Sequence, residues 1–314
     1  MSNNNNNNSN KNNMTVATGS IQNVGVIGLG RMGTAIANNI IKSGFNLVVY
    51  NRTADKSSTL VEAGATITAS PKEATSKSDV VLTSLRDDAA LLEVVNGEKG
   101  ILSGLRPRTI HIGTSTISPS LSTKLAQMHN AQGSLYLAAP VLGNPAAAKE
   151  GKLTTFVAGD ETAIKSCKRF LNSYCQRVIE VGDQHAKANS LKLSANYVML
   201  VLLDIMGQVY ALAEKSNIDL QLVNELLEMI FAYPGLKQYA KRIRTRDFDN
   251  VGFDLLSAFK DVQLILQASS DVRVPLSYAN NIKDKYIAAI ANNMDKKDWI
   301  SIYEITRMLA GLKK

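Results

Sequence analysis

A glycine-rich loop near the start of the chain has the residue types and spacing that bind a dinucleotide. It follows a short β-branched stretch and precedes a helix-like stretch, and its residues are Gly28, Leu29, Gly30, Arg31, Met32 and Gly33. The first glycine permits a tight turn, the second lets a pyrophosphate approach the backbone, and the third lets helix and strand pack closely. The N–H groups at the helix start then bind the pyrophosphate. We therefore expect a dinucleotide site; the alternative is an ordinary strand-to-helix turn.

The end of the next strand indicates which dinucleotide is bound. An NAD site has Asp or Glu there, which accepts hydrogen bonds from the ribose hydroxyls. This chain has Asn51, Arg52 and Thr53 instead. Arg52 can pair with a 2′-phosphate, and the other two side chains can hydrogen-bond to it. We therefore predict that the cofactor is NADP; the alternative is that Arg52 is a solvated turn residue.

Lys192 and Asn196 are polar residues within a largely apolar stretch, 191–212. Residues four apart lie on one face of a helix. A lysine in such surroundings is costly unless it has partners or a task. Burial also lowers the pKa of a lysine toward neutrality, where it can exchange protons with a substrate. Lys192 is therefore a candidate acid and base; the alternative is a lysine on an exposed stripe of the helix.

Up to residue 181, short β-branched stretches alternate with helix-like stretches, which is typical of a parallel sheet covered by helices. Helices are expected over 33–43 and after Ser70 and Ser118, each of which precedes a proline. Beyond residue 181 the periodicity is helical. The predicted fold class is α/β, an N-terminal Rossmann-type doubly wound parallel sheet followed by an all-α C-terminal domain. The predicted strands are 24–27, 47–50, 79–82, 109–112, 134–138, 155–158 and 177–181.

We expect three segments: a disordered Asn-rich tail over 1–20, a dinucleotide-binding domain over 21–183, and a helical substrate and dimerisation domain over 184–314. Nine of the first thirteen residues are Asn, so the tail cannot bury a core. The stretch 191–212 is apolar on nearly all sides. A helical domain of about 130 residues cannot surround such a helix alone. We therefore expect a homodimer or a higher homo-oligomer.

The composition excludes several classes of protein. Lys+Arg 35 against Asp+Glu 27 gives a net charge of +8, which favours anionic partners. The two cysteines and three histidines lack the spacing of a zinc site or a disulfide framework, so we expect no metal. Cys167 and Cys175 are expected to pack within one helix.

Targeting and membrane signals are also missing from the sequence. No apolar run approaches the roughly 18 residues that cross a bilayer. The first residues form neither an apolar secretory segment nor an Arg-rich presequence. We therefore expect a soluble cytoplasmic protein, in preference to a mitochondrial one, with no membrane partner.

Several motifs along the chain resemble those of the β-hydroxyacid dehydrogenases. This family includes the 3-hydroxyisobutyrate dehydrogenases and the glyoxylate/succinic semialdehyde reductases, the branch that the chain resembles. The resemblance runs from about residue 23 to the C-terminus. Besides the glycine loop, it rests on Ser115–Pro119 (S-T-x-x-P), Ala139–Gly143 (A-P-V-x-G), Lys192 with Asn196 (K-x-x-x-N), and Phe253 with Lys260-Asp261 (F…K-D).

The resemblance implies an NADP(H)-dependent oxidoreductase. Its substrate would be a small 3-hydroxy acid, or a 4-hydroxy or 2-hydroxy acid, which it interconverts with the semialdehyde or keto form. By this resemblance Lys192 is the catalytic acid and base, and the substrate is bound by Thr116, Gly143, Asn144 and Asn196. Further contacts to the cofactor are implied for Leu85, Thr116 and Lys260.

One departure from the family keeps other functions open. The family has S-G-G where this chain has Leu142-Gly143-Asn144, so a hydroxyl donor is missing, a side chain has entered the pocket, and a bulkier or less polar substrate becomes an alternative. The loop is also similar to that of imine reductases, which usually carry Asp or Tyr where this chain has Lys192. An imine or non-acid carbonyl reductase on the same scaffold is therefore one alternative.

A non-catalytic module that binds nucleic acid is the other alternative, although we do not expect a nucleic-acid partner. It would use a basic stretch, for which we favour a solvated helix face or a patch near the cofactor phosphates. The residues of this stretch are Lys237, Lys241, Arg242, Arg244 and Arg246.

Overall fold

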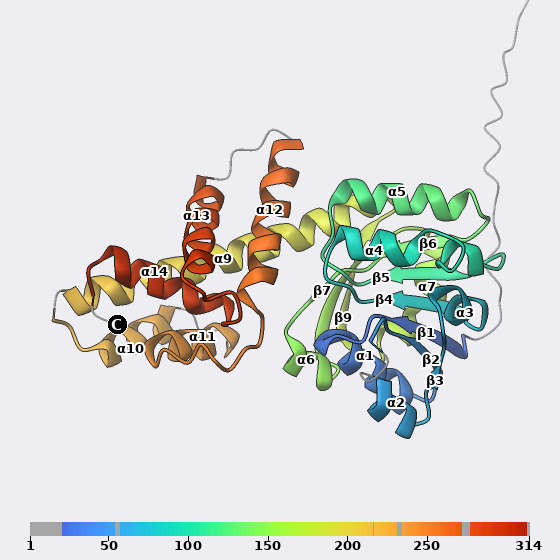
Figure 1. Ribbon diagram of the computed structural model, residues 1–314, viewed down its shortest axis with the longest axis horizontal. Helices are drawn as coiled ribbons and strands as arrows, with labels where there is room; N and C mark the ends of the chain where they lie inside the picture. Colours follow the sequence, from blue (N-terminus) through green and yellow to red (C-terminus); the bar gives the residue numbers. More distant parts are fainter. Residues whose placement is uncertain (1–20, 54–56, 216, 231–233, 272–276, 313–314) are drawn as a thin grey trace, which may run out of the picture.

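The computed structural model describes residues 21–53, 57–215, 217–230, 234–271 and 277–312. The Asn-rich tail predicted over 1–20 lies outside these residues. The described chain forms a sheet covered by helices, followed by a body built from helices (Figure 1). The predicted fold class is confirmed.

The sheet has the strand order β3-β2-β1-β4-β5-β6-β8-β7, with β9 paired to β8. The strand pairs from β3 to β6 are all parallel. The strand order reverses at β1, because β2 and β3 lie on one side of it and β4 to β6 on the other. The carboxyl ends of β1 and β4 therefore border the crevice in which such sheets bind ligands. β8 is antiparallel to β6 and β7. The strands are β1 (Asn23–Ile27), β2 (Asn46–Tyr50), β3 (Thr66–Ile67), β4 (Val80–Thr83), β5 (Ile110–Gly113), β6 (Leu135–Ala138), β7 (Val141–Leu142), β8 (Leu153–Ala158) and β9 (Cys175–Gly182).

Two helices of the sheet domain begin where the sequence signals predict, whereas α1 begins at Arg31, two residues before the predicted start. Ser70 accepts a hydrogen bond from Glu73 N at 3.1 Å, and Ser118 accepts one from Leu121 N at 3.1 Å, so both serines cap a helix that starts with proline. These helices are α1 (Arg31–Lys42), α2 (Ser58–Glu62), α3 (Pro71–Ser76), α4 (Asp88–Val95), η2 (Leu102–Gly104), α5 (Pro119–Asn130), α6 (Pro145–Lys149), α7 (Glu161–Ser166) and α8 (Lys168–Leu171).

One long helix, α9 (His185–Lys215), joins the two bodies. Its 31 residues rise about 45 Å, and it leaves the sheet domain to run through the helical body (Figure 1). Ala188 belongs to a core cluster of the sheet domain, whereas Leu200 and Met206 belong to the core of the helical body. The other elements of that body are α10 (Leu220–Ile230), α11 (Pro234–Arg244), α12 (Leu255–Asp271), α13 (Ser277–Ala291), η3 (Trp299–Ser301) and α14 (Ile302–Leu309).

Part of the apolar surface of α9 is not covered by the rest of the chain. Leu191 is 40% exposed and Val198 is 55% exposed. This uncovered surface agrees with the expectation of a homo-oligomer, which stays a prediction. None of the helices in the described ranges combines the length and the apolar character that a membrane span requires.

Two details of the sequence interpretation are wrong. Cys167 lies between α7 and α8 whereas Cys175 begins β9, so the two cysteines do not share a helix; both are buried and reduced. A turn at Asn172-Ser173 separates them. The prediction was wrong because the apolar residues on either side of this turn are spaced as in one helix. The two-residue strands β3 and β7 were also not predicted, because so short a strand is specified by its neighbour and not by its own pattern.

Two histidines form a buried pair that supports the end of β4. His129 Nδ1 lies 2.7 Å from Leu125 O, and because a carbonyl oxygen only accepts, Nδ1 is the donor and Nε2 is an acceptor. His111 therefore donates from Nδ1 to His129 Nε2 at 3.0 Å, and its Nε2 accepts from Thr83 Oγ1 at 2.9 Å. Burial lowers the pKa of both histidines, that of His129 to about 4.

The free energy of unfolding is expected to fall as the pH drops below about 6.5. The unfolded histidines bind protons near that pH while the folded ones stay neutral, so each costs about 1.4 kcal/mol of stability per pH unit until its folded pKa is reached. Urea unfolding between pH 7 and 5 measures this slope. The Asn side chain in His129→Asn can still donate to Leu125 O but cannot titrate. The free energy of unfolding of this variant should therefore fall less steeply with decreasing pH. Equal slopes would contradict the role assigned to the pair.

Candidate active site

Each glycine of the phosphate loop meets a different constraint. Gly28 has φ +97°, and a Cβ on it would lie 2.3 Å from Ser84 O. A Cβ on Gly33 would lie 2.0 Å from Gly28 O, so only glycine lets α1 pack on the turn. A Cβ on Gly30 would meet no atom within 4 Å, and Gly30 gives α1 no side-chain cap. The first N–H groups of α1 thus have no side-chain cap, and a hollow lined by Leu29, Gly30 and Arg31 opens beside them, so the loop fits a pyrophosphate.

The side chains of the other loop residues are engaged within the protein. Leu29 is buried, and its N–H donates to Asn51 Oδ1 at 2.9 Å. Met32 packs against the core of the sheet domain. Arg31 donates from Nη1 to Val251 O of the helical body, so it bridges the two bodies. Arg31 and Met32 can therefore serve a cofactor through their backbone N–H groups.

The segment after β2 holds the residues predicted to select NADP. Both polar atoms of the Asn51 amide have a partner, because Oδ1 accepts from Leu29 N and Nδ2 donates to Thr53 O at 2.7 Å. Asn51 thus ties this segment to the phosphate loop, and the second N–H of its Nδ2 can still donate to a phosphate. Arg52 is 85% exposed and lies 3.7 Å from Glu93 of α4. Asn51, Arg52 and Thr53 therefore all remain candidates for a 2′-phosphate contact.

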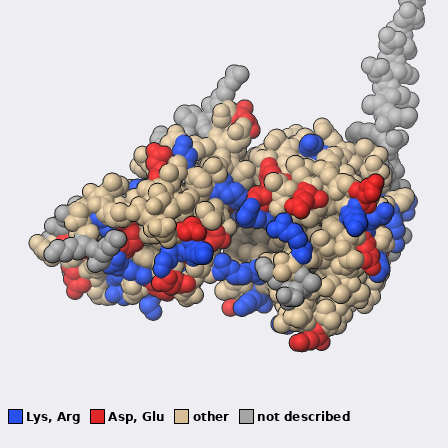
Figure 2. Space-filling view, viewed as in Figure 1, with Lys and Arg blue, Asp and Glu red and all other residues tan. Residues whose placement is uncertain are grey.

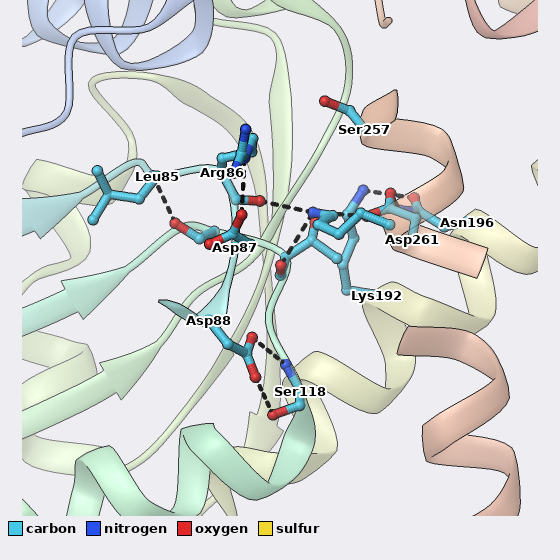
Figure 3. A network of polar contacts seen from close by, with 12 residues as sticks. Leu85, Arg86, Asp87, Asp88, Ser118, Lys192, Asn196, Ser257 and Asp261 are labelled. Atoms are coloured by element: carbon cyan, nitrogen blue, oxygen red, sulfur yellow. Dashed lines mark hydrogen bonds and ion pairs between the residues drawn. The ribbon is translucent and has the colours of Figure 1, made fainter. Parts of the chain in front are cut away.

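The segments after β4 and β5 are joined beside this crevice. Leu85 N donates to Ser115 Oγ at 2.8 Å. Asp88 accepts from Ser118 N at 3.0 Å and from Ser118 Oγ at 2.5 Å, which connects the first turns of α4 and α5 (Figure 3). These bonds place Leu85 and the half-buried Thr116 at one edge of the sheet, where the helical body approaches.

Lys192 begins a chain of polar contacts that crosses between the two bodies (Figure 3). Its Nζ donates to Asn196 Oδ1 at 2.7 Å, and Asn196 Nδ2 donates to Asp261 Oδ2 at 2.5 Å. Asp261 Oδ1 lies 2.9 Å from Lys260 Nζ. Lys260 in turn donates to Arg86 O at 3.0 Å and to Thr116 O at 3.3 Å. The chain therefore links α9 and α12 to the predicted nicotinamide end of the crevice.

Burial, together with two neighbouring charges of opposite sign, sets the acidity of Lys192. The side chain is 7% exposed, and burial lowers its pKa to about 8. The Asp261 carboxylate opposes this shift, whereas the neighbouring Lys260 ammonium adds to it. Lys192 can therefore be protonated or neutral near neutral pH, which is the property that proton transfer requires.

Asp261 is a member of the site that the sequence interpretation did not assign. It is 2% exposed on α12, a helix that supplies Val262 and Ile265 to the core of the helical body. A carboxylate at such a position needs a partner, and its place after Lys260 in the K-D motif was a signal that could have identified it.

The predicted substrate loop lies at the start of α6. Gly143 has φ +136°, and a Cβ on it would lie 2.6 Å from Leu153 Cδ2. Asn144 Oδ1 accepts from Ala147 N at 2.9 Å and so caps α6. The side-chain oxygen is thereby engaged in holding the start of α6.

Two arginines of the basic stretch, which covers α11 and the residues just after it, form ion pairs within the protein. Arg242 is buried and lies 3.1 Å from Asp298, and Arg246 lies 2.8 Å from Glu304. Elsewhere, Lys and Arg side chains gather around the hollow between the two bodies (Figure 2). The distribution of charge favours an anionic ligand in the hollow over nucleic acid on α11.

Comparisons with known proteins agree with this geometry. A family model described as the NAD binding domain of 6-phosphogluconate dehydrogenase matches residues 23–182. A second, described as NAD-binding of NADP-dependent 3-hydroxyisobutyrate dehydrogenase, matches residues 186–306. The uncharacterized oxidoreductase YfjR of Bacillus subtilis is 35% identical over 279 residues, which are 89% of this chain and 98% of that protein. The chain belongs to the β-hydroxyacid dehydrogenase family.

Proteins with lower sequence identity to this chain have names that state an activity. The probable mitochondrial 3-hydroxyisobutyrate dehydrogenase of Dictyostelium discoideum is 28% identical over 92% of each chain. The solved 3-hydroxyisobutyrate dehydrogenase of Salmonella typhimurium has a TM-score of 0.80 at 21% identity, over 90% of this chain and 99% of that chain. An imine reductase of Myxococcus stipitatus has a TM-score of 0.63 at 18% identity, over 92% and 99%. The two solved structures share the fold of this β-hydroxyacid dehydrogenase family member.

The pKa of Lys192 should respond in opposite directions to its two charged neighbours. Asp261→Asn removes the anion and should lower the pKa below about 8, whereas Lys260→Met removes a cation and should raise it. Titration of the lysine side chains by NMR, with Lys192→Met to identify the resonance, measures both values. Shifts of the same sign in the two variants would contradict the charge balance described above.

Proposed function

We propose that the protein is an NADP(H)-dependent oxidoreductase that interconverts a small 3-hydroxy acid, or a 4-hydroxy or 2-hydroxy acid, and its semialdehyde or keto form. The observation that carries this proposal is the buried Lys192, whose pKa is lowered to about 8 and whose polar partners reach Thr116 beside the crevice. Membership of the β-hydroxyacid dehydrogenase family supports it.

In the proposed reaction Lys192 transfers the proton. NADPH, when bound, supplies a hydride, and NADP⁺ accepts one in the reverse direction. Lys192 donates a proton from Nζ to the substrate carbonyl oxygen during reduction and takes it back from the hydroxyl during oxidation. Asn196 aims the ammonium group, because its Oδ1 accepts from Nζ while Asp261 holds its amide nitrogen. A pKa near working pH suits transfer in both directions.

The substrate is proposed to lie between Lys192 and the loop at Gly143. Backbone N–H groups of Gly143 and Asn144 would receive its carboxylate, and Thr116 would contact both the substrate and the nicotinamide. Leu142 stands where the family motif has a serine, so one hydroxyl donor to the carboxylate is missing and a bulkier or less polar substrate is also compatible with the loop.

NADP is proposed as the cofactor because Arg52 and Thr53 follow β2 where an NAD site has a carboxylate. The name of the family model over residues 186–306, which includes NADP-dependent 3-hydroxyisobutyrate dehydrogenase, supports the choice.

An imine reductase is the second candidate. Leu142 in the substrate loop and the structural likeness to an imine reductase favour it. Lys192 argues against it, since imine reductases usually carry Asp or Tyr at that position. A panel of semialdehydes, glyoxylate, hydroxy acids and cyclic imines separates the two, and a clear preference for cyclic imines would replace the first proposal.

Replacement of Lys192 by Ala should abolish most of the catalysis. General acid–base groups contribute about 100-fold to 10,000-fold, so kcat should fall by at least about 100-fold in both directions. Steady-state assays with NADP(H) and the best substrate of the panel measure this. Binding of NADPH to the variant, followed by calorimetry, should change little; unchanged kcat would refute the role of Lys192.

Arg52→Gln should raise the KM for NADPH and leave that for NADH unchanged. A charge-assisted contact to the 2′-phosphate is lost, for which we expect about a tenfold effect. The wild-type protein should have a lower KM for NADPH than for NADH. Equal values for the two cofactors in the wild type would remove the role assigned to Arg52.

A further inference from the structure

An acidic side chain lies beside the predicted 2′-phosphate site. Glu93 is on α4, and its Oε2 is 3.7 Å from Arg52 Nη1. Both side chains are exposed, Arg52 to 85% and Glu93 to 64%. The ion pair therefore joins the segment after β2 to α4 across the surface where an adenosine ribose would lie.

The position of Glu93 is not explained by the stability of its helix. It lies in the last turn of α4, where the helix dipole favours cations over anions, and no basic residue is present in that turn. An ion pair this exposed also contributes little to folding stability. Within the described residues, Arg52 is the one ion-pair partner of Glu93. The carboxylate is thus paired with the one charged side chain that is proposed to contact the 2′-phosphate.

A 2′-phosphate bound to Arg52 would lie within roughly 7 Å of this carboxylate, which is shorter than a Debye length at physiological salt. The two anions would repel each other, and Glu93 would compete with the phosphate for the guanidinium. Repulsion at that range through water corresponds to about a threefold to tenfold loss of affinity. A ribose with a free 2′-hydroxyl would instead find an acceptor, the role that a strand-end carboxylate has in NAD sites.

We propose that Glu93 is a cofactor-specificity residue that moderates the preference for NADP. It competes with the 2′-phosphate for Arg52, and it accepts a hydrogen bond from the ribose when the phosphate is absent, so that NADH is also bound. This inference rests on the proposed function, because it assumes that Arg52 receives the 2′-phosphate. It goes further because it assigns a second residue, whose effect is opposite to that of Arg52, to the choice between NADP and NAD.

Calorimetric titration of the unliganded protein with NADPH and with NADH tests the proposal without any need for turnover. Glu93→Gln should bind NADPH about threefold to tenfold more tightly and NADH more weakly. The gain for NADPH should shrink between 0.05 and 0.5 M NaCl, because added salt screens the repulsion. Glu98→Gln is the matched control: it removes the same charge from an exposed residue close to the end of α4 that has no ion pair with Arg52. It should change neither affinity by more than about twofold.

The variants separate this proposal from the one on which it rests. If Arg52→Gln weakens NADPH while Glu93→Gln changes neither nucleotide, or changes both in the same direction, the role of Glu93 is wrong and that of Arg52 stands. If Arg52→Gln leaves NADPH binding unchanged, or the wild type binds neither nucleotide, both proposals fail. An equal gain for NADPH in Glu98→Gln would also overturn the proposal, since the effect would then be one of net charge.

Discussion

The buried ammonium group of Lys192 is the constraint on which the site depends. A buried charge is costly unless it is paired and hydrogen-bonded, and this one reaches its counter-charge, Asp261, only through Asn196. Asp261 is held in turn by Lys260, which donates to carbonyl groups of the sheet domain. The contacts that make burial of the lysine tolerable therefore also bring the two bodies together at the crevice.

The long helix α9 makes this arrangement possible. Its first turns are anchored in the core of the sheet domain through Ala188, and its later turns form the centre of the helical body. Lys192 lies just beyond the anchored turns, so the helix holds its side chain at the junction. Arg31 adds a second bridge, from the phosphate loop to Val251. The nucleotide loop and the candidate acid are thus fixed to one framework.

Local signals in the sequence were sufficient to predict the fold class, but they did not indicate the partners of the candidate site side chains. The glycine loop and the caps at Ser70 and Ser118 act over a few residues, and the structure has them as predicted. Asn51 and Asn196 are predicted to bind ligands, and the sequence did not show that both amides also have partners within the protein. Such pairings depend on three-dimensional packing, which residue type and spacing do not specify.

In the proposed reaction Lys192 gives up its proton in the step that transfers hydride. The pH dependence of hydride transfer in single turnovers tests this step, with the substrate that the panel identifies and with NADPH deuterated at the transferred position. If Lys192 supplies the proton, the rate of reduction should carry the isotope effect and fall as the pH rises through about 8. A rate that carries the isotope effect but stays constant from pH 6 to 10 would contradict it.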